Sequence, residues 1–150
     1  MTGIEHRYSD YLETHVQVGV AGDKVVSVRF TDSPEGDSNG SQVLEDIFAY
    51  LDGEDVDLSG YDVGLTVAGV ERRALERTRE IPRGTTVTYT ELAQSIGVDD
   101  DEFPEVREAI DTNPVPILLP SHRVVAESGL GNFAGPKRVK RRLLELEGGL

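Results

Sequence analysis

Cysteine is absent from this sequence, which excludes disulfide bonds, thiolate metal sites and cysteine nucleophiles. Histidine is scarce, and because His6, His15 and His122 stand far apart, no histidine-based zinc site is expected. Long apolar runs are missing too, since no segment approaches the roughly 18 residues that indicate a transmembrane helix. The first residues, MTGIEHRYSD, lack the basic and apolar regions of a signal peptide. We therefore expect a cytoplasmic monomer with no metal, no cofactor and no membrane partner.

Lysine is also in short supply. Only 3 of the 15 basic residues are lysine, and 28 acidic residues give a net charge of −13. Such a composition is typical of halophilic proteins in molar salt, although an acidic protein from an ordinary environment shares it. Residues 1–70 hold 14 acidic and 3 basic side chains, whereas residues 71–150 hold 14 acidic and 12 basic ones. The second part therefore carries the smaller negative charge, as an anion-binding region requires.

The first part of the chain has the pattern of a small α/β unit. HVQVGV (15–20) and VVSVRF (25–30) alternate polar and apolar residues around the turn AGDK, which predicts a β-hairpin. SQVLEDIFAYLDG (41–53) has apolar residues at helical spacing, with a serine to cap the helix and a glycine to end it. A short strand is predicted at 63–67, and the unit is expected to end near residue 68.

The rest of the chain predicts mainly helices. Apolar periodicity indicates helices over 70–81, 88–97, 103–113 and the basic-then-apolar segment 136–149. The pair at 88–97 and 104–112 has the spacing of a helix-turn-helix. Between the last two helices, three prolines exclude a regular helix over NPVPILLP (113–120).

Three motifs in this region occur in a specific order: IPRGTTVTYTELA (81–93), NPVPILLPSHRVV (113–125) and SGLGNFAGPKRVKRRLLELEG (128–148). Together they resemble the methylated-DNA–protein-cysteine methyltransferase family over about residues 63–148. The resemblance implies a small RNase-H-like α/β N-terminal lobe, residues 1–68. It also implies a mainly α C-terminal domain, residues 69–150, with a winged-helix-like helix-turn-helix that binds DNA.

The resemblance also implies a site. In the family an alkylated guanine is flipped into a pocket under the turn that matches PSHRV (120–124), where a cysteine takes the alkyl group irreversibly. Ser121 falls at that acceptor position, and His122 falls at the position of a histidine that relays a proton through water. The resemblance further implies that Glu147 orients this histidine and that Asn113 is the hinge between the recognition helix and the site. The implied lesion pocket comprises Tyr89, Ser121, Val124, Phe133, Ala134 and Gly135. The implied DNA contacts are Thr88, Tyr89, Arg107, Arg123, Lys137, Arg138 and Lys140.

Serine at position 121 departs from the family pattern. Alkyl transfer is a displacement at saturated carbon that favours an ionisable thiol, and a hydroxyl is a much weaker nucleophile. Four interpretations of Ser121 remain open: alkyl transfer to serine, another serine-hydrolase chemistry, a local role in the turn, and a lining of a lesion pocket that does not react. The last resembles alkyltransferase-like proteins, which lack the cysteine, bind alkylated guanine and present it to excision repair.

A second departure concerns DNA binding. The family places an arginine finger nine residues before the hinge asparagine, and Pro104 stands at that position here, with Arg107 as a displaced candidate. Seven acidic residues between 98 and 113 would also repel phosphates, although molar salt screens that repulsion. Basic residues cluster at 72–83 and 137–142, either as phosphate contacts or as ion-paired helix surfaces.

Three functional hypotheses follow. The leading one is a non-catalytic alkyltransferase-like protein that binds alkylated guanine in double-stranded DNA and signals to excision-repair proteins. The second is an interaction or regulatory protein of the same fold that has lost DNA binding. The third is an active enzyme of the methyltransferase type that uses Ser121.

Overall fold

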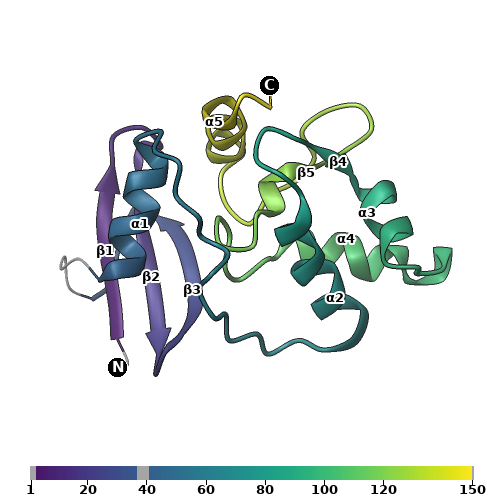
Figure 1. The fold of residues 1–150 in the computed structure, drawn as a ribbon, viewed down its shortest axis with the longest axis horizontal. Helices are drawn as coiled ribbons and strands as arrows, with labels where there is room; N and C mark the ends of the chain where they lie inside the picture. The colour runs from purple at the N-terminus through teal and green to yellow at the C-terminus, as the bar shows by residue number, and fades with distance from the viewer. Residues whose placement is uncertain (1–2, 37–40, 150) are drawn as a thin grey trace.

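The computed structural model describes residues 3–36 and 41–149 (Figure 1). Its regular elements, in chain order, are β1 (Gly3–Ser9), β2 (Thr14–Ala21), β3 (Lys24–Thr31), α1 (Gln42–Leu51), α2 (Gly69–Arg77), η1 (Thr78–Glu80), β4 (Val87–Thr88), α3 (Tyr89–Ser95), η2 (Asp100–Glu102), α4 (Phe103–Asp111), η3 (Ser121–Arg123), β5 (Val124–Val125) and α5 (Lys137–Glu147).

An antiparallel sheet of order β1-β2-β3 forms the N-terminal lobe, and α1 lies across its face (Figure 1). The predicted hairpin is confirmed as β2 and β3, whose alternating valines Val16, Val18 and Val28 are at most 2% exposed. The predicted helix at 42–51 is confirmed as well, and the Ser41 hydroxyl accepts a hydrogen bond from the Leu44 backbone at 3.4 Å. Strand β1 was not predicted, because it is an outer strand with few buried side chains and therefore lacks the alternating pattern.

Helices dominate the C-terminal lobe, where α2 packs against α4 and α3 lies beside both (Figure 1). Helix α3 begins with a capping box, in which Thr88 and Glu91 exchange hydrogen bonds between side chain and backbone. Helix α5 ends at Glu147 and is capped by Gly148, whose φ of +78° suits glycine. A short parallel pair, β4 with β5, joins Val87 to Val124 and so brings the start of α3 beside the PSHRV turn.

Two predicted boundaries need correction. The strand expected at 63–67 is reduced to one isolated bridge, in which Asp62 and Gly64 exchange backbone hydrogen bonds with Val25 of β3 on either side of Val63. The helix expected over 70–81 ends earlier, at Arg77, and continues as one 3₁₀ turn, η1. Pro82 explains this end, because a proline disfavours α-helical geometry in the residue before it.

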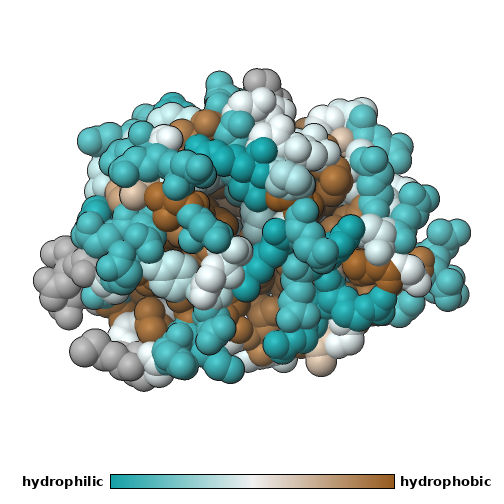
Figure 2. Space-filling model, viewed as in Figure 1, coloured by the Kyte–Doolittle hydropathy of each residue, from teal (hydrophilic) through white to brown (hydrophobic). Residues whose placement is uncertain are grey.

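The two lobes meet along β3, α1 and α5. The Val28 amide of β3 donates to the Pro114 carbonyl at 2.9 Å, and the Tyr11 hydroxyl donates to the Arg142 carbonyl at 2.6 Å. On the face in Figure 2, hydrophilic residues surround separate small hydrophobic patches. No helix in the described ranges is long and apolar enough to cross a membrane. The architecture is thus a small sheet-containing lobe followed by a helical part; the division at residues 68 and 69 stays a prediction.

Candidate functional site

Asn113 organises the PSHRV turn. Its side chain is buried, and its Oδ1 accepts from the Val115 amide at 2.9 Å. Its Nδ2 donates to the Leu119 carbonyl at 2.7 Å and to the Ser121 Oγ at 2.9 Å. Because the prolines of this segment prevent helical hydrogen bonding, one asparagine amide supplies the bonds that fix the loop. Ser121, at the start of η3, is 1% exposed.

Glu147 is the centre of a buried network behind the turn. Its Oε2 accepts from the His122 Nε2 at 2.8 Å and from the Tyr50 hydroxyl at 2.5 Å. Arg123 adds two bonds, from Nε to Oε1 at 2.9 Å and from Nη2 to Oε2 at 2.8 Å. Both oxygens of the carboxylate therefore accept hydrogen bonds, and these bonds link α1, η3 and α5.

This network sets the charges at the site. Burial alone would raise the pKa of Glu147, but the hydrogen bonds from His122 and Arg123 outweigh it and hold the pKa well below its ordinary range. Burial lowers the pKa of His122, although its bond to Glu147 opposes this effect. A neutral His122 that donates from Nε2 leaves Nδ1 as an acceptor, and Nδ1 is buried with no hydrogen-bond partner among the described residues.

Ser121 and His122 do not form a nucleophile–base pair. The Ser121 Oγ contacts Asn113, and among the described residues the His122 ring bonds only Glu147. A serine nucleophile needs a base within hydrogen-bond reach of its hydroxyl. The free Nδ1 of His122 is the one basic atom in the turn that could take a proton through an intervening water.

Tyr89 lies in a second cluster at the start of α3. Its hydroxyl donates to Asp111 Oδ1 at 2.5 Å, and the Arg107 guanidinium lies 4.7 Å from the centre of its ring. Burial, together with the bond to Asp111, raises the pKa of Tyr89. Asn132 also donates to Asp111, at 3.3 Å, and therefore ties α4 to the loop before α5. A Cβ at Gly131 would lie 3.0 Å from the Tyr89 ring, so the loop passes closely over the tyrosine.

Lys140 points inward from α5 and has no exposed surface. Its ammonium donates to the carbonyls of Val124 at 2.7 Å and Asn132 at 2.8 Å, and burial lowers its pKa to about 8. Lys140 thus holds the loop before α5 onto β5.

Three residues of the implied pocket, Phe133, Ala134 and Gly135, lie beside strand β3. Phe133 packs against Phe30 of β3, with ring centroids 5.8 Å apart, and a Cβ at Gly135 would lie 2.9 Å from the Phe30 ring. Asn113 and Ala134 line a cleft of about 370 Å³ together with residues 27–30 of β3. The N-terminal lobe therefore contributes one wall beside the loop.

The implied DNA contacts are divided in the structure. Lys137 and Arg138 are exposed on α5, and Arg107 is exposed while it contacts Tyr89 and Asp111. Arg123 and Lys140 instead bind the protein's own carboxylate and carbonyl groups. As DNA contacts, all of these, with Thr88, stay predictions.

Sequence reasoning missed several members of the site. Tyr50, Phe30, Asp111 and Asn132 all contact residues of the predicted set. The contacts of Tyr50 with Glu147, Phe30 with Phe133 and Asp111 with Tyr89 span 22 to 103 positions, so no local pattern marks them. From the sequence, Tyr50 is expected to be an ordinary core residue on the buried face of α1. Only the structure shows that its hydroxyl donates to Glu147.

Comparison with known proteins gives consistent matches. The family model described as 6-O-methylguanine DNA methyltransferase, DNA binding domain, matches residues 69–149. A methylated-DNA–protein-cysteine methyltransferase of Methanopyrus kandleri is 41% identical over 120 residues, covering 80% of this chain and 89% of its own. Another, of Metallosphaera sedula, is 30% identical over 150 residues, covering 96% and 94%.

Solved structures agree with these relatives. The Mycobacterium tuberculosis O6-methylguanine methyltransferase superposes with a TM-score of 0.82 at 26% identity, over 99% of this chain and 93% of its own. The structure of the M. tuberculosis protein in complex with DNA superposes with a TM-score of 0.81 at 26% identity, covering 97% and 92%.

Proposed function

Because the chain belongs to the methylated-DNA–protein-cysteine methyltransferase family and yet contains no cysteine, we propose that it is a non-catalytic, alkyltransferase-like protein. It binds alkylated guanine in double-stranded DNA through the helix-turn-helix of α3 and α4. It then presents the lesion to excision repair. In this account Ser121 occupies the acceptor position and lines the pocket without reacting.

One observation carries this proposal: the buried network around the PSHRV turn is complete while the serine itself is not activated. Glu147 holds His122 and Arg123, and Asn113 holds the turn. No base among the described residues contacts the Ser121 hydroxyl, and a hydroxyl is a poor nucleophile toward alkyl carbon. The geometry therefore argues against alkyl transfer to Ser121.

DNA binding is supported by the relatives and by α5. The relative from M. tuberculosis has been solved with DNA, and this chain shares its fold. Lys137, Arg138 and Arg141 are exposed on α5, where they can contact phosphates. Because Pro104 stands where the family's arginine finger is expected, we propose that Arg107 fills the gap left by the flipped base. Its guanidinium already lies over the Tyr89 ring.

The test uses a duplex with one O6-methylguanine and a matched unmodified duplex, each at low and at high potassium chloride. Mobility shift measures binding, and intact mass measures covalent transfer in the same samples. A lesion-dependent shift with no mass gain is expected. A methyl group found on Ser121 would instead establish an enzyme.

A second candidate is an interaction protein of the same fold that no longer binds DNA. It is favoured by the acidic surface around α4, since Asp99, Asp100, Asp101, Glu105 and Glu108 are exposed and repel phosphates. Under this account neither duplex would shift at any salt concentration.

A further inference from the structure

Asp111 is the last residue of α4, a position that does not favour an acidic side chain. The carbonyl groups at the C-terminus of a helix carry partial negative charge, so a carboxylate there is repelled by its own helix. The Asp111 side chain is therefore held by groups outside α4. The structure shows which groups these are.

Both carboxylate oxygens of Asp111 have partners. Oδ1 accepts from the Tyr89 hydroxyl at 2.5 Å. Oδ2 accepts from the Asn132 Nδ2 at 3.3 Å and lies 3.9 Å from the Arg107 Nε. Burial lowers the pKa of Lys140 to about 8, and the nearby charge of Asp111 opposes this shift. One anion with two oxygens is thus surrounded by a hydroxyl, an amide and two cations.

These groups suit a phosphodiester as well as a carboxylate. Both anions present two charged oxygens, and hydroxyl, amide and guanidinium groups are the donors that bind phosphates in DNA. Tyr89, Arg107 and Lys140 are also three of the DNA contacts that the family resemblance implies. The cluster reaches the surface, since the Arg107 side chain is 45% exposed and that of Asp111 is 17% exposed. A phosphate of a bound duplex can therefore reach it.

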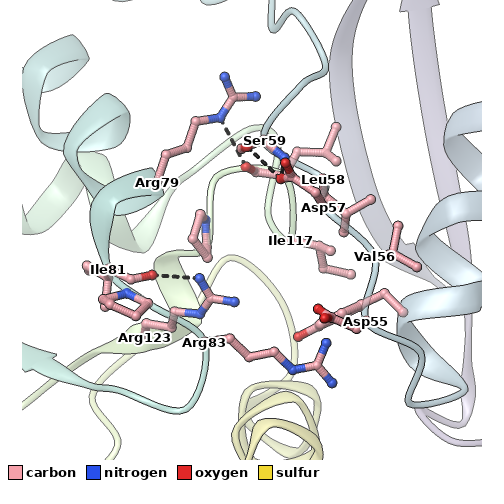
Figure 3. A pocket seen from close by; sticks show the side chains of 14 residues that line it. Asp55, Val56, Asp57, Leu58, Ser59, Arg79, Ile81, Arg83, Ile117 and Arg123 are labelled. Carbon is pink, nitrogen blue, oxygen red and sulfur yellow. Dashed lines mark hydrogen bonds between the residues drawn. The ribbon is translucent and has the colours of Figure 1, made fainter.

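A second group of arginines does not form a comparable set of donors. A cavity of about 320 Å³ behind the PSHRV turn is lined by Arg79, Arg83 and Arg123 (Figure 3). Arg79 and Arg83 lie at opposite ends of this cavity, as Figure 3 shows, and Arg123 is bonded to Glu147. The donors there do not meet at one point, whereas those around Asp111 meet at a single carboxylate.

We propose that Tyr89, Asn132 and Arg107 form a binding site for a DNA phosphodiester, and that Asp111 occupies this site in the free protein as an internal competitor. This inference rests on the proposed DNA binding and adds a control on it. A duplex phosphate displaces the Asp111 carboxylate before it reaches the three donors. The local carboxylate, and not only the overall acidity of α4, therefore limits the affinity for DNA.

The test compares the wild type with Asp111→Asn, which removes the charge and keeps the shape of the side chain. Asp111→Ala is a second variant, which also removes the acceptor of the Tyr89 hydroxyl. Glu108→Gln is the matched control, because Glu108 is an exposed acid of the same helix. Fluorescence anisotropy measures the Kd for the O6-methylguanine duplex and the unmodified duplex over a series of potassium chloride concentrations. Circular dichroism checks that each variant is folded.

Both Asp111 variants should bind both duplexes about tenfold more tightly than the wild type, or by about 1.4 kcal/mol. The slope of log K against log salt should steepen by about 0.9, as expected for one more phosphate contact. Glu108→Gln should change the Kd by about twofold at most, because solvent and salt screen an exposed charge. Adding Arg107→Gln to Asp111→Asn should remove most of the gain, because one of the phosphate donors is lost.

Three results would overturn the inference: an equal gain in Glu108→Gln, no gain in either Asp111 variant, or a gain that survives Arg107→Gln. The lesion preference of the wild type tests the proposed function separately. Tighter binding by Asp111→Asn with equal affinities for the two duplexes would support the phosphate site and contradict lesion recognition.

Discussion

The side-chain amide of Asn113 donates to the Ser121 Oγ at 2.9 Å, and in the described part of the chain no basic nitrogen contacts that hydroxyl. The serine therefore serves as a hydrogen-bond acceptor in a rigid loop. In the same loop, the Nδ1 of His122 has no hydrogen-bond partner among the described residues. This atom could take the proton from a side chain at position 121 that is more acidic than serine.

Ser121→Cys is expected to create alkyl transfer. A thiol has a pKa near 8.5, and the neighbouring basic His122 favours its ionised form, so the variant has the nucleophile that serine lacks. Intact mass after incubation with the O6-methylguanine duplex should show one added methyl group, and the wild type should show none. If the cysteine variant binds the duplex but gains no mass, the buried network is not a competent alkyl-transfer site.

Tyr50→Phe is expected to lower the free energy of unfolding by about 1.5–3 kcal/mol. The lost hydroxyl donates to the buried Glu147 carboxylate at 2.5 Å, and hydrogen bonds to charged groups have about this strength. Chemical denaturation measures the change. Tyr8→Phe is the matched control, since Tyr8 is 49% exposed, and it should leave stability unchanged. Equal stabilities for both variants would show that the bond between α1 and α5 contributes little.

Acidification is expected to destabilise the fold through His122. Because burial lowers its pKa in the folded state, the unfolded chain binds a proton first as pH falls below about 6.5. The contribution of His122 to stability should thus be constant above that pH and decline as the pH falls further. His122→Gln should flatten this decline in denaturant titrations, whereas His6→Gln should keep it. A decline of the same slope in His122→Gln would assign it to other groups.

Stability should also rise between about pH 8 and pH 10 because of Lys140. Its pKa in the folded protein is about 8, against about 10.4 in an unfolded chain, so the folded state loses the proton first. In the sign convention of linkage, the unfolded state then binds more protons and stability increases with pH. Unfolding free energies across this range measure the slope, and Lys140→Met should abolish it. A slope unchanged by this substitution would contradict a buried, desolvated ammonium.

The sequence predicted the elements whose pattern is local. The hairpin of β2 and β3 and helix α1 have regular apolar spacing and clear caps, and the structure contains them at almost the predicted boundaries. Outer strand β1 and the two-residue strands β4 and β5 escaped prediction, because strands so exposed or so short carry no periodicity.

The site was predictable where a motif is contiguous and not where it is assembled in three dimensions. PSHRV and the final LELEG placed Ser121, His122 and Glu147 together by resemblance. Tyr50 reaches Glu147 across 97 positions, a contact that only the packing of α1 against α5 creates. The charge pattern likewise marked Lys140 as one of several bases, although its side chain turns inward to the Val124 carbonyl.

The most direct test of the account is the ratio of affinities for the O6-methylguanine duplex and the unmodified duplex, with intact mass recorded on the bound sample. The account predicts a clear preference for the methylated duplex and a protein mass unchanged after binding. Equal affinities, or a methyl group on the protein, would contradict it.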